Sequence, residues 1–191
     1  MAVLLRKSAV GNLPAGREIA SAVMGIFRQQ YERYLASPSD SMGRWDAKLA
    51  DALQKPLLQL YMRSAIKARG NRPLDERELA ADLTANAKTR ALELARDLNS
   101  TSRQWLEQGR EGATIFSADR AASIGLTEAS RAHHDAKAVT ASAAGVKRLR
   151  WVAKGSSCPE CKSLNGKTIE IGKEFVSKGG TRAEYPPLHP H

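Results

Sequence analysis

Apolar residues spaced three and four positions apart predict that most of this chain is helical. One stripe of such residues runs through positions 19–35 and stops at the polar segment SPSDSMG. A second stripe runs through positions 49–60. This spacing places apolar side chains on one face of a helix, so the two stripes predict two amphipathic helices. Pro56 lies inside the second helix and predicts a kink, because proline lacks the N–H that the helical turn requires.

A third helix is predicted from a start signal at residues 74–79. Asp75 is suited to cap the first turn while Glu78 reaches back, and Leu74 is placed to pack on Leu79. The polar segment 99–102 is a candidate interruption. The predicted buried face consists of Leu79, Leu83, Ala87, Ala91, Leu94, Leu98 and Trp105.

A fourth helix is predicted from the N-cap residue Ser117 to a stop at Gly145. Its predicted stripe is made of small residues, which favour close packing: Ala122, Leu126, Ala129, Ala132, Ala136, Val139 and Ala143. Glu128 and Arg131 are spaced for an ordinary surface ion pair. His133 and His134 are adjacent and so face different directions, which argues against joint metal binding. No pair of nucleophile and base stands out.

Beyond Gly145 the pattern changes to short mixed segments. Residues 146–153 and 167–171 predict two strands of a small hairpin around a cysteine turn, and residues 177–191 predict a loop. The expected fold is therefore mainly α with a small C-terminal α+β module. We expect a helical arm over residues 1–110, and over residues 111–191 a module formed by a helix and a short hairpin with a CxxC turn.

Composition supports a folded protein and narrows its partners. The 191 residues are 42% hydrophobic and 26% charged, which is typical of globular proteins. No apolar run approaches the roughly 18 residues of a membrane span, and the first residues lack a secretory apolar core, so we expect neither a membrane nor export. The net charge of +10 favours nucleic acid or acidic protein surfaces as partners.

One of two basic clusters is a candidate for nucleic-acid contact. Its residues are Lys147, Arg148 and Arg150 on the first predicted strand and Lys154 directly after it. Alternation on a strand places Arg148 and Arg150 on the face opposite Lys147, Leu149 and Trp151, which suits either nucleic-acid contact or plain solvation. In the second cluster, at the end of the second helix, cations complement the helix dipole without any partner: Arg63, Lys67, Arg69 and Arg72.

The two cysteines, Cys158 and Cys161, form the sequence CPEC and are followed by the turn dipeptide Asn165-Gly166. This pattern is the usual half-site of a structural zinc ion. His189 and His191 are the candidate third and fourth ligands. Two unliganded thiols and a redox pair remain as alternatives, the redox pair being disfavoured because the motif is not expected to open a helix.

The order of motifs from Arg120 to the C-terminus resembles the Mu F-like minor head protein family of tailed bacteriophages. The family motif on the fourth helix is represented by Arg120, Thr127 and Glu128. The later pieces are Gly145-Val146, Trp151, Cys158, Cys161, Leu164-Asn165-Gly166-Lys167, Phe175 and Pro186-Pro187-x-His189-Pro190.

This resemblance implies a head morphogenesis or minor capsid protein without enzymatic activity. Such a protein would reside in the virion head, and in the host cytoplasm during assembly. It would dock on the portal or the major capsid protein and contact packaged double-stranded DNA, with no small-molecule substrate. A zinc-ribbon-like nucleic-acid-binding protein is the alternative.

Two features depart from the family pattern. Leu126 stands where the family has an arginine, so any role of that arginine is lost here. Members also tend to continue after the final His-Pro with Cys-Arg-Cys, and such a cysteine would replace His191 as a zinc ligand.

Overall fold

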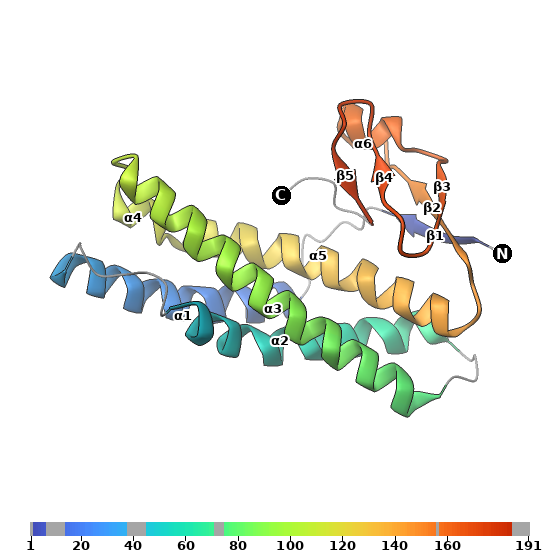
Figure 1. Ribbon diagram of the computed structural model, residues 1–191, viewed down its shortest axis with the longest axis horizontal. Coiled ribbons are helices and arrows are strands. Elements are labelled where there is room, and N and C mark those ends of the chain that lie inside the picture. The colour runs from blue at the N-terminus through green and yellow to red at the C-terminus, as the bar shows by residue number, and fades with distance from the viewer. Residues whose placement is uncertain (1, 7–13, 38–44, 71–74, 156, 185–191) are drawn as a thin grey trace.

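The computed structural model describes residues 2–6, 14–37, 45–70, 75–155 and 157–184, the first five and residues 14–15 as backbone only. Four long helices lie alongside one another (Figure 1): α1 (Pro14–Ala36), α2 (Trp45–Arg69), α3 (Glu76–Glu107) and α5 (Ala118–Ala143). A single-turn helix, α4 (Gly112–Ile115), joins α3 to α5. The predicted mainly helical fold is confirmed.

A small β-rich module covers one end of α5 (Figure 1). It contains β2 (Arg148–Val152), a short helix α6 (Pro159–Ser163), β3 (Thr168–Glu170), β4 (Phe175–Val176) and β5 (Arg182–Ala183). The predicted hairpin is confirmed, because β2 and β3 pair antiparallel with Leu149 opposite Ile169. Two details differ from the prediction. The expected C-terminal loop, residues 177–191, contains β5, which pairs with β4 directly before the loop, and β1 (Ala2–Arg6) pairs parallel with β2.

Local capping residues determine where α3 and α5 begin. The Asp75 carboxylate accepts hydrogen bonds from the backbone N–H groups of Arg77 and Glu78, at 2.8 and 3.1 Å. The Ser117 hydroxyl accepts one from the N–H of Arg120. Both predicted helix starts are therefore confirmed, while Leu74, the predicted packing partner of Leu79, lies outside the described residues.

The predicted interruption at residues 99–102 is wrong, because α3 continues through it. Two polar side chains there, Asn99 and Ser102, are buried and find partners on other helices. Asn99 accepts a hydrogen bond from Gln30 and donates one to Asp46, both at 2.6 Å, and Ser102 accepts one from Arg120. Helix α2 is continuous through Pro56 to Arg69, and the kink expected at Pro56 stays a prediction.

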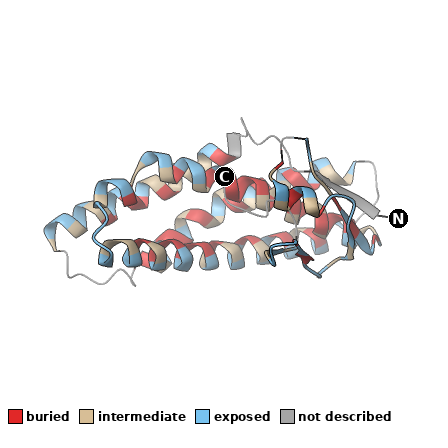
Figure 2. Cartoon of the chain, turned by 90° about the horizontal axis from the view of Figure 1, so that it is seen from above, coloured by how far each residue is buried: buried red, intermediate tan, exposed pale blue. Residues whose placement is uncertain are grey.

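The buried face of α5 is broader than the predicted stripe and rotated from it. Ala129, Ala132 and Ala136 are buried as predicted, but Ala122, Leu126 and Ala143 are exposed. Seen from above, the buried faces of the long helices turn toward one another (Figure 2). Helix α5 contacts α1, α2 and α3, and this enclosure explains the wide buried arc.

The described residues form two hydrophobic cores. The first lies among α1, α2, α3, α4 and α5 and includes Phe27, Leu53 and Leu83. The second joins Ala138 of α5 to Leu149, Trp151, Cys161, Leu164 and Phe175. Most of α5, which follows the boundary expected between residues 110 and 111, belongs to the first core.

Close contact between α1 and α5 depends on two glycines. A Cβ atom at Gly125 would overlap the carbonyl oxygen of Gly16 and lie 2.9 Å from the Cβ of Ala20. Backbone atoms cannot move away without separating the two helices. Glycine at position 125 therefore sets the distance between α1 and α5.

We predict that Gly125→Ala lowers the free energy of unfolding by about 1–3 kcal/mol, the usual cost of overpacking. Thermal or urea unfolding measures it. Gly25→Ala in α1 is the matched control, because no atom lies within 4 Å of a Cβ there. The control should stabilise the protein by up to about 1 kcal/mol through helix propensity. Equal stabilisation by both substitutions would contradict the close approach.

Candidate functional site

Arg120, the first residue of the family motif, connects several elements of the helical core. Its guanidinium lies over the rings of Phe27 and Trp105, 5.1 and 4.6 Å from their centroids. The same group donates hydrogen bonds to the Ser102 hydroxyl at 2.8 Å and to the Ile115 carbonyl at 2.7 Å. Burial lowers the pKa of Arg120 to about 10, so the side chain stays protonated at neutral pH. Its contacts are those of a structural clamp between α3, α4 and α5.

Glu128 forms the predicted ion pair with Arg131 but is buried, with 2% exposure, so the pair is not the ordinary surface pair that was expected. Its carboxylate accepts two hydrogen bonds from Arg90 of α3, from Nε at 2.7 Å and from Nη2 at 2.8 Å. Arg131, the predicted partner, is more distant at 3.4 Å. The neighbouring motif residue, Thr127, is also buried. Sequence spacing identified the neighbour within the helix but not the cation supplied by α3.

The contact with Glu128 stabilises the positive charge of Arg90. Burial alone would lower the pKa of Arg90, but hydrogen bonding and charge attraction from Glu128 outweigh burial and raise it. A two-pronged arginine–carboxylate contact is the strongest form of this interaction. The pair joins α3 to α5 inside the bundle.

Of the two histidines of α5, His134 is buried and His133 is half-buried, and both are neutral at physiological pH. His133 Nδ1 lies 3.2 Å from the Ser64 hydroxyl of α2, and burial, with the charges of Lys137 and Lys67, lowers its pKa to about 4. His134 is completely buried, and neither ring nitrogen has a hydrogen-bond partner among the described residues. Burial, followed by the charges of His133 and Lys137, lowers its pKa to about 3.

The cysteine turn opens a helix, contrary to the prediction. Cys158 is the N-cap of α6, and the backbone N–H of Cys161 donates a hydrogen bond to Cys158 Sγ at 3.4 Å. Cys161 is buried in the second core, while Cys158 is partly exposed. The Asn165 side chain accepts a hydrogen bond from the Ala153 N–H, and Gly166 has a φ of +82°, as the predicted tight turn requires.

The predicted second pair of zinc ligands, His189 and His191, lies outside the described residues. Within the described ranges, no group of three or more His, Cys, Asp or Glu side chains is arranged to hold a metal ion. The described part of the module supplies two thiols from the first turn of α6, those of Cys158 and Cys161. Two thiols at this spacing fit half of a tetrahedral zinc site.

The basic cluster of β2 has the predicted alternation. Arg148 and Arg150 are exposed, while Leu149 and Trp151 are buried in the second core. Lys147 and Lys154, at either end of the strand, are also exposed. The outer face of β2 therefore presents cations while its inner face packs on the module.

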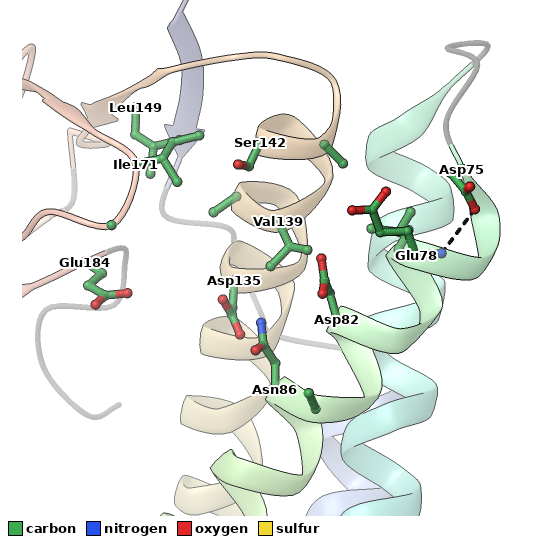
Figure 3. Close-up of a pocket in the computed structure, with 15 residues that line it drawn as sticks. Asp75, Glu78, Asp82, Asn86, Asp135, Val139, Ser142, Leu149, Ile171 and Glu184 are labelled. Atoms are coloured by element: carbon green, nitrogen blue, oxygen red, sulfur yellow. Dashed lines mark hydrogen bonds between the residues drawn. The ribbon is translucent and has the colours of Figure 1, made fainter.

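A groove that the sequence analysis missed runs between α3, α5 and the β-rich module (Figure 3). Its volume is about 580 Å³. Its apolar lining includes Leu79, Val139, Leu149 and Ile171. Five carboxylates line it, and among the described residues no Lys or Arg does: Asp75, Glu78 and Asp82 of α3, Asp135 of α5, and Glu184 after β5.

The carboxylates of this groove influence one another. Burial raises the pKa of Glu184, and the negative charges of Asp135, Glu174 and Glu93 raise it further. In sequence, Asp75 and Glu78 are ordinary helix N-terminal acids that complement the helix dipole, and Asp82 follows one turn later. Only the packing of the β-rich module opposite them creates an enclosed acidic surface.

No membrane-spanning candidate occurs among the helices of the described residues, since none combines sufficient length with sufficient apolar character. The chain matches no protein-family model, no curated protein and no solved structure. Inferences about function therefore rest on the motifs and on the arrangement of the residues above.

The contact between Arg90 and Glu128 is testable with a double-mutant cycle. Glu128→Leu alone should cost about 3–5 kcal/mol, because it leaves the Arg90 charge partly buried without its anion. Combining it with Arg90→Met should cost less than the sum of the single changes by at least about 1 kcal/mol. Chemical denaturation measures each free energy of unfolding.

The exposed pair Arg182–Glu174, at 3.4 Å, provides the control cycle. Its coupling should be about 0–1 kcal/mol because solvent screens both charges. Additive effects of the Arg90 and Glu128 substitutions would rule out the buried pair.

Proposed function

We propose that this chain is a minor head protein of a tailed bacteriophage that acts by docking rather than by catalysis. It would be made in the host cytoplasm and incorporated into the virion head in few copies. Its partners there would be the portal or the major capsid protein, and packaged double-stranded DNA. Its role would be in head assembly or genome delivery.

The observation that carries this proposal is the position of the motif residues in the fold. Trp151 and Phe175, far apart in the sequence, meet edge to face with ring centroids 5.1 Å apart. Cys161 lies in the same small core, and the Asn165-Gly166 turn leads from α6 into β3, with the Asn165 side chain bonded to the Ala153 N–H at the end of β2. These later residues of the resemblance thus share one small core, while Arg120 and Glu128 lie in the helical bundle. A shared core of this kind supports a module common to a family.

The interactions of the polar motif residues support docking over catalysis. Arg120 is held by aromatic rings, a hydroxyl and a carbonyl, and Glu128 by Arg90. Groups committed to such contacts stabilise the bundle and are not directed at a substrate. A protein whose motif residues are structural performs its function through its surface.

Contact with DNA is proposed for the exposed face of β2. Arg148 and Arg150 lie on the exposed face of β2, and the exposed Lys147 and Lys154 flank the strand. Phosphate contacts need cations on a surface but no base-specific geometry, so the interaction would be independent of sequence and sensitive to salt. The same basic face would also serve the alternative function, that of a zinc-ribbon-like nucleic-acid-binding protein.

We further propose a structural zinc ion bound by Cys158 and Cys161 together with His189 and His191. Zinc bound to these four side chains would tie the chain's final residues to the α6 turn. The second core is small, so metal binding would add substantially to the stability of the module.

The decisive experiment examines the particle. Heads purified from infected cells should contain the chain at a small, fixed ratio to the major capsid protein, measured by quantitative mass spectrometry. Incorporation should persist in Arg148→Ala/Arg150→Ala, because docking on protein and contact with DNA use different surfaces. Absence of the chain from purified heads would refute the head-protein proposal.

The alternative is distinguished with the isolated protein. Steeply salt-dependent DNA binding, together with absence from heads, would favour a free nucleic-acid-binding protein. The log–log salt slope should then fall by about 1 for each of Arg148→Ala and Arg150→Ala. Arg96→Ala and Arg103→Ala on the exposed side of α3 are matched controls that should leave the slope unchanged.

For zinc, we predict about one equivalent of metal in protein purified without chelator. Cys158→Ser and His189→Ala should each release it, and chelator should accelerate hydrogen exchange over residues 146–184 while α1–α3 stay protected. Chelator added to Cys158→Ser should have no further effect. A metal content near zero in a protein whose module is fully protected would contradict the site.

A further inference from the structure

We propose that the groove between α3, α5 and the β-rich module binds a second copy of this chain through an exposed ridge on α2. The ridge consists of Arg63, Ile66 and Lys67. This inference is independent of the proposed function, because it rests only on surfaces that the structure describes.

Among the described residues, the groove is lined by acidic and apolar side chains and by no Lys or Arg. The apolar ones include Leu79, Val139 and Ile171, and the acidic ones are the five carboxylates named above. A volume of about 580 Å³ accommodates several side chains of a partner. This mixture fits an apolar side chain flanked by cations.

The α2 ridge has this chemistry. Ile66 is 70% exposed, the largest exposure among the large hydrophobic side chains of the described residues. Residues 63, 66 and 67 lie on one face of a helix because they are separated by three and four positions. Arg63 and Lys67 are exposed beside Ile66, and Arg63 makes only an exposed 3.5 Å contact with Glu18.

Opposite charges favour contact between the ridge of one copy and the groove of another over other contacts between two copies. Two copies that each carry a net charge of +10 repel one another over most approaches. The acidic groove is a local exception, and the basic ridge is attracted to it. Burying Ile66 against the apolar side chains of the groove adds a favourable hydrophobic contribution to the binding free energy, which does not depend on charge.

The ridge and the groove are different surfaces of one chain, so the contact is formed by unlike patches on the two copies. An altered ridge leaves the groove of the same molecule intact, and the reverse also holds. In a mixture of a ridge variant and a groove variant, the intact groove of the first can therefore still bind the intact ridge of the second.

Sedimentation of the full-length chain over a range of concentrations tests the proposal. The wild-type protein should show reversible, concentration-dependent association. Ile66→Asp and Asp82→Lys should each raise the dissociation constant at least about tenfold. Salt screens both the attraction between ridge and groove and the repulsion between two positively charged copies. The test of the contact is therefore the pair of variants and not a salt titration.

Matched controls separate the two surfaces from general effects of charge. Leu35→Asp introduces the same change at an apolar residue of α1 that is 63% exposed, and Asp97→Lys does so at an exposed residue of α3 outside the groove. Both should associate as the wild type does. Circular dichroism and melting temperature should be unchanged in all four variants, because every altered side chain is exposed.

A mixture of Ile66→Asp with Asp82→Lys gives the sharpest result. Each variant alone should be monomeric, while the mixture should form a one-to-one complex and nothing larger. A wild-type protein that remains monomeric up to about 1 mM would overturn the proposal, and a groove that binds a Lys- and Arg-rich peptide in that monomer would identify a different occupant. Association that survives both variants would place the contact elsewhere and would also overturn it.

Discussion

The close contact of α5 with its neighbours is the constraint on which the rest of the structure depends. Gly16 and Gly125 bring the backbones of α1 and α5 together, and the alanines of α5 allow α2 and α3 to approach as well. A helix enclosed in this way has little surface on which polar side chains can reach water. The polar residues of its middle turns must therefore find partners inside the protein.

The internal pairs follow from that enclosure. Glu128 is compensated by Arg90, Arg120 by aromatic faces and two oxygen acceptors, and His133 by Ser64. His134 has no such partner among the described residues and is accommodated as a neutral ring. The contacts of Glu128, Arg120 and His133 each join α5 to another element. Residues that look functional in the sequence therefore hold the bundle together.

Features governed by neighbouring residues were predictable from the sequence. The caps at Asp75 and Ser117 depend on side chains two or three positions from the N–H groups they satisfy, and the β2–β3 hairpin depends on the turn at Asn165-Gly166. The buried face of α5 was predicted only partly, because a stripe of alanines gives a weak hydrophobic signal. Small residues occur on both sides of such a helix, and only its packing partners decide which side is buried.

Features created by distant segments were not predictable. The partner of Glu128 is 38 positions away on α3, and the polar residues at 99 and 102 appear to break a helix only until their partners on other helices are known. The strand β1 pairs with β2 across nearly the whole chain, so no local pattern marks it. The acidic groove has the same origin, since its α3 rim is an ordinary acidic helix start until the β-rich module lies opposite.

The second core explains how the protein separates surfaces of opposite charge. In β2, alternation directs Leu149 toward the groove and α5, and directs Arg148 and Arg150 to the outside. Burial of the inner residues fixes the register of the strand, because a shift by one position would exchange the two faces. The apolar packing of Leu149, Trp151 and Phe175 thus keeps the cations away from the acidic groove. Within a chain of net charge +10, one small core thus maintains an acidic surface on one side of a strand and a basic surface on the other.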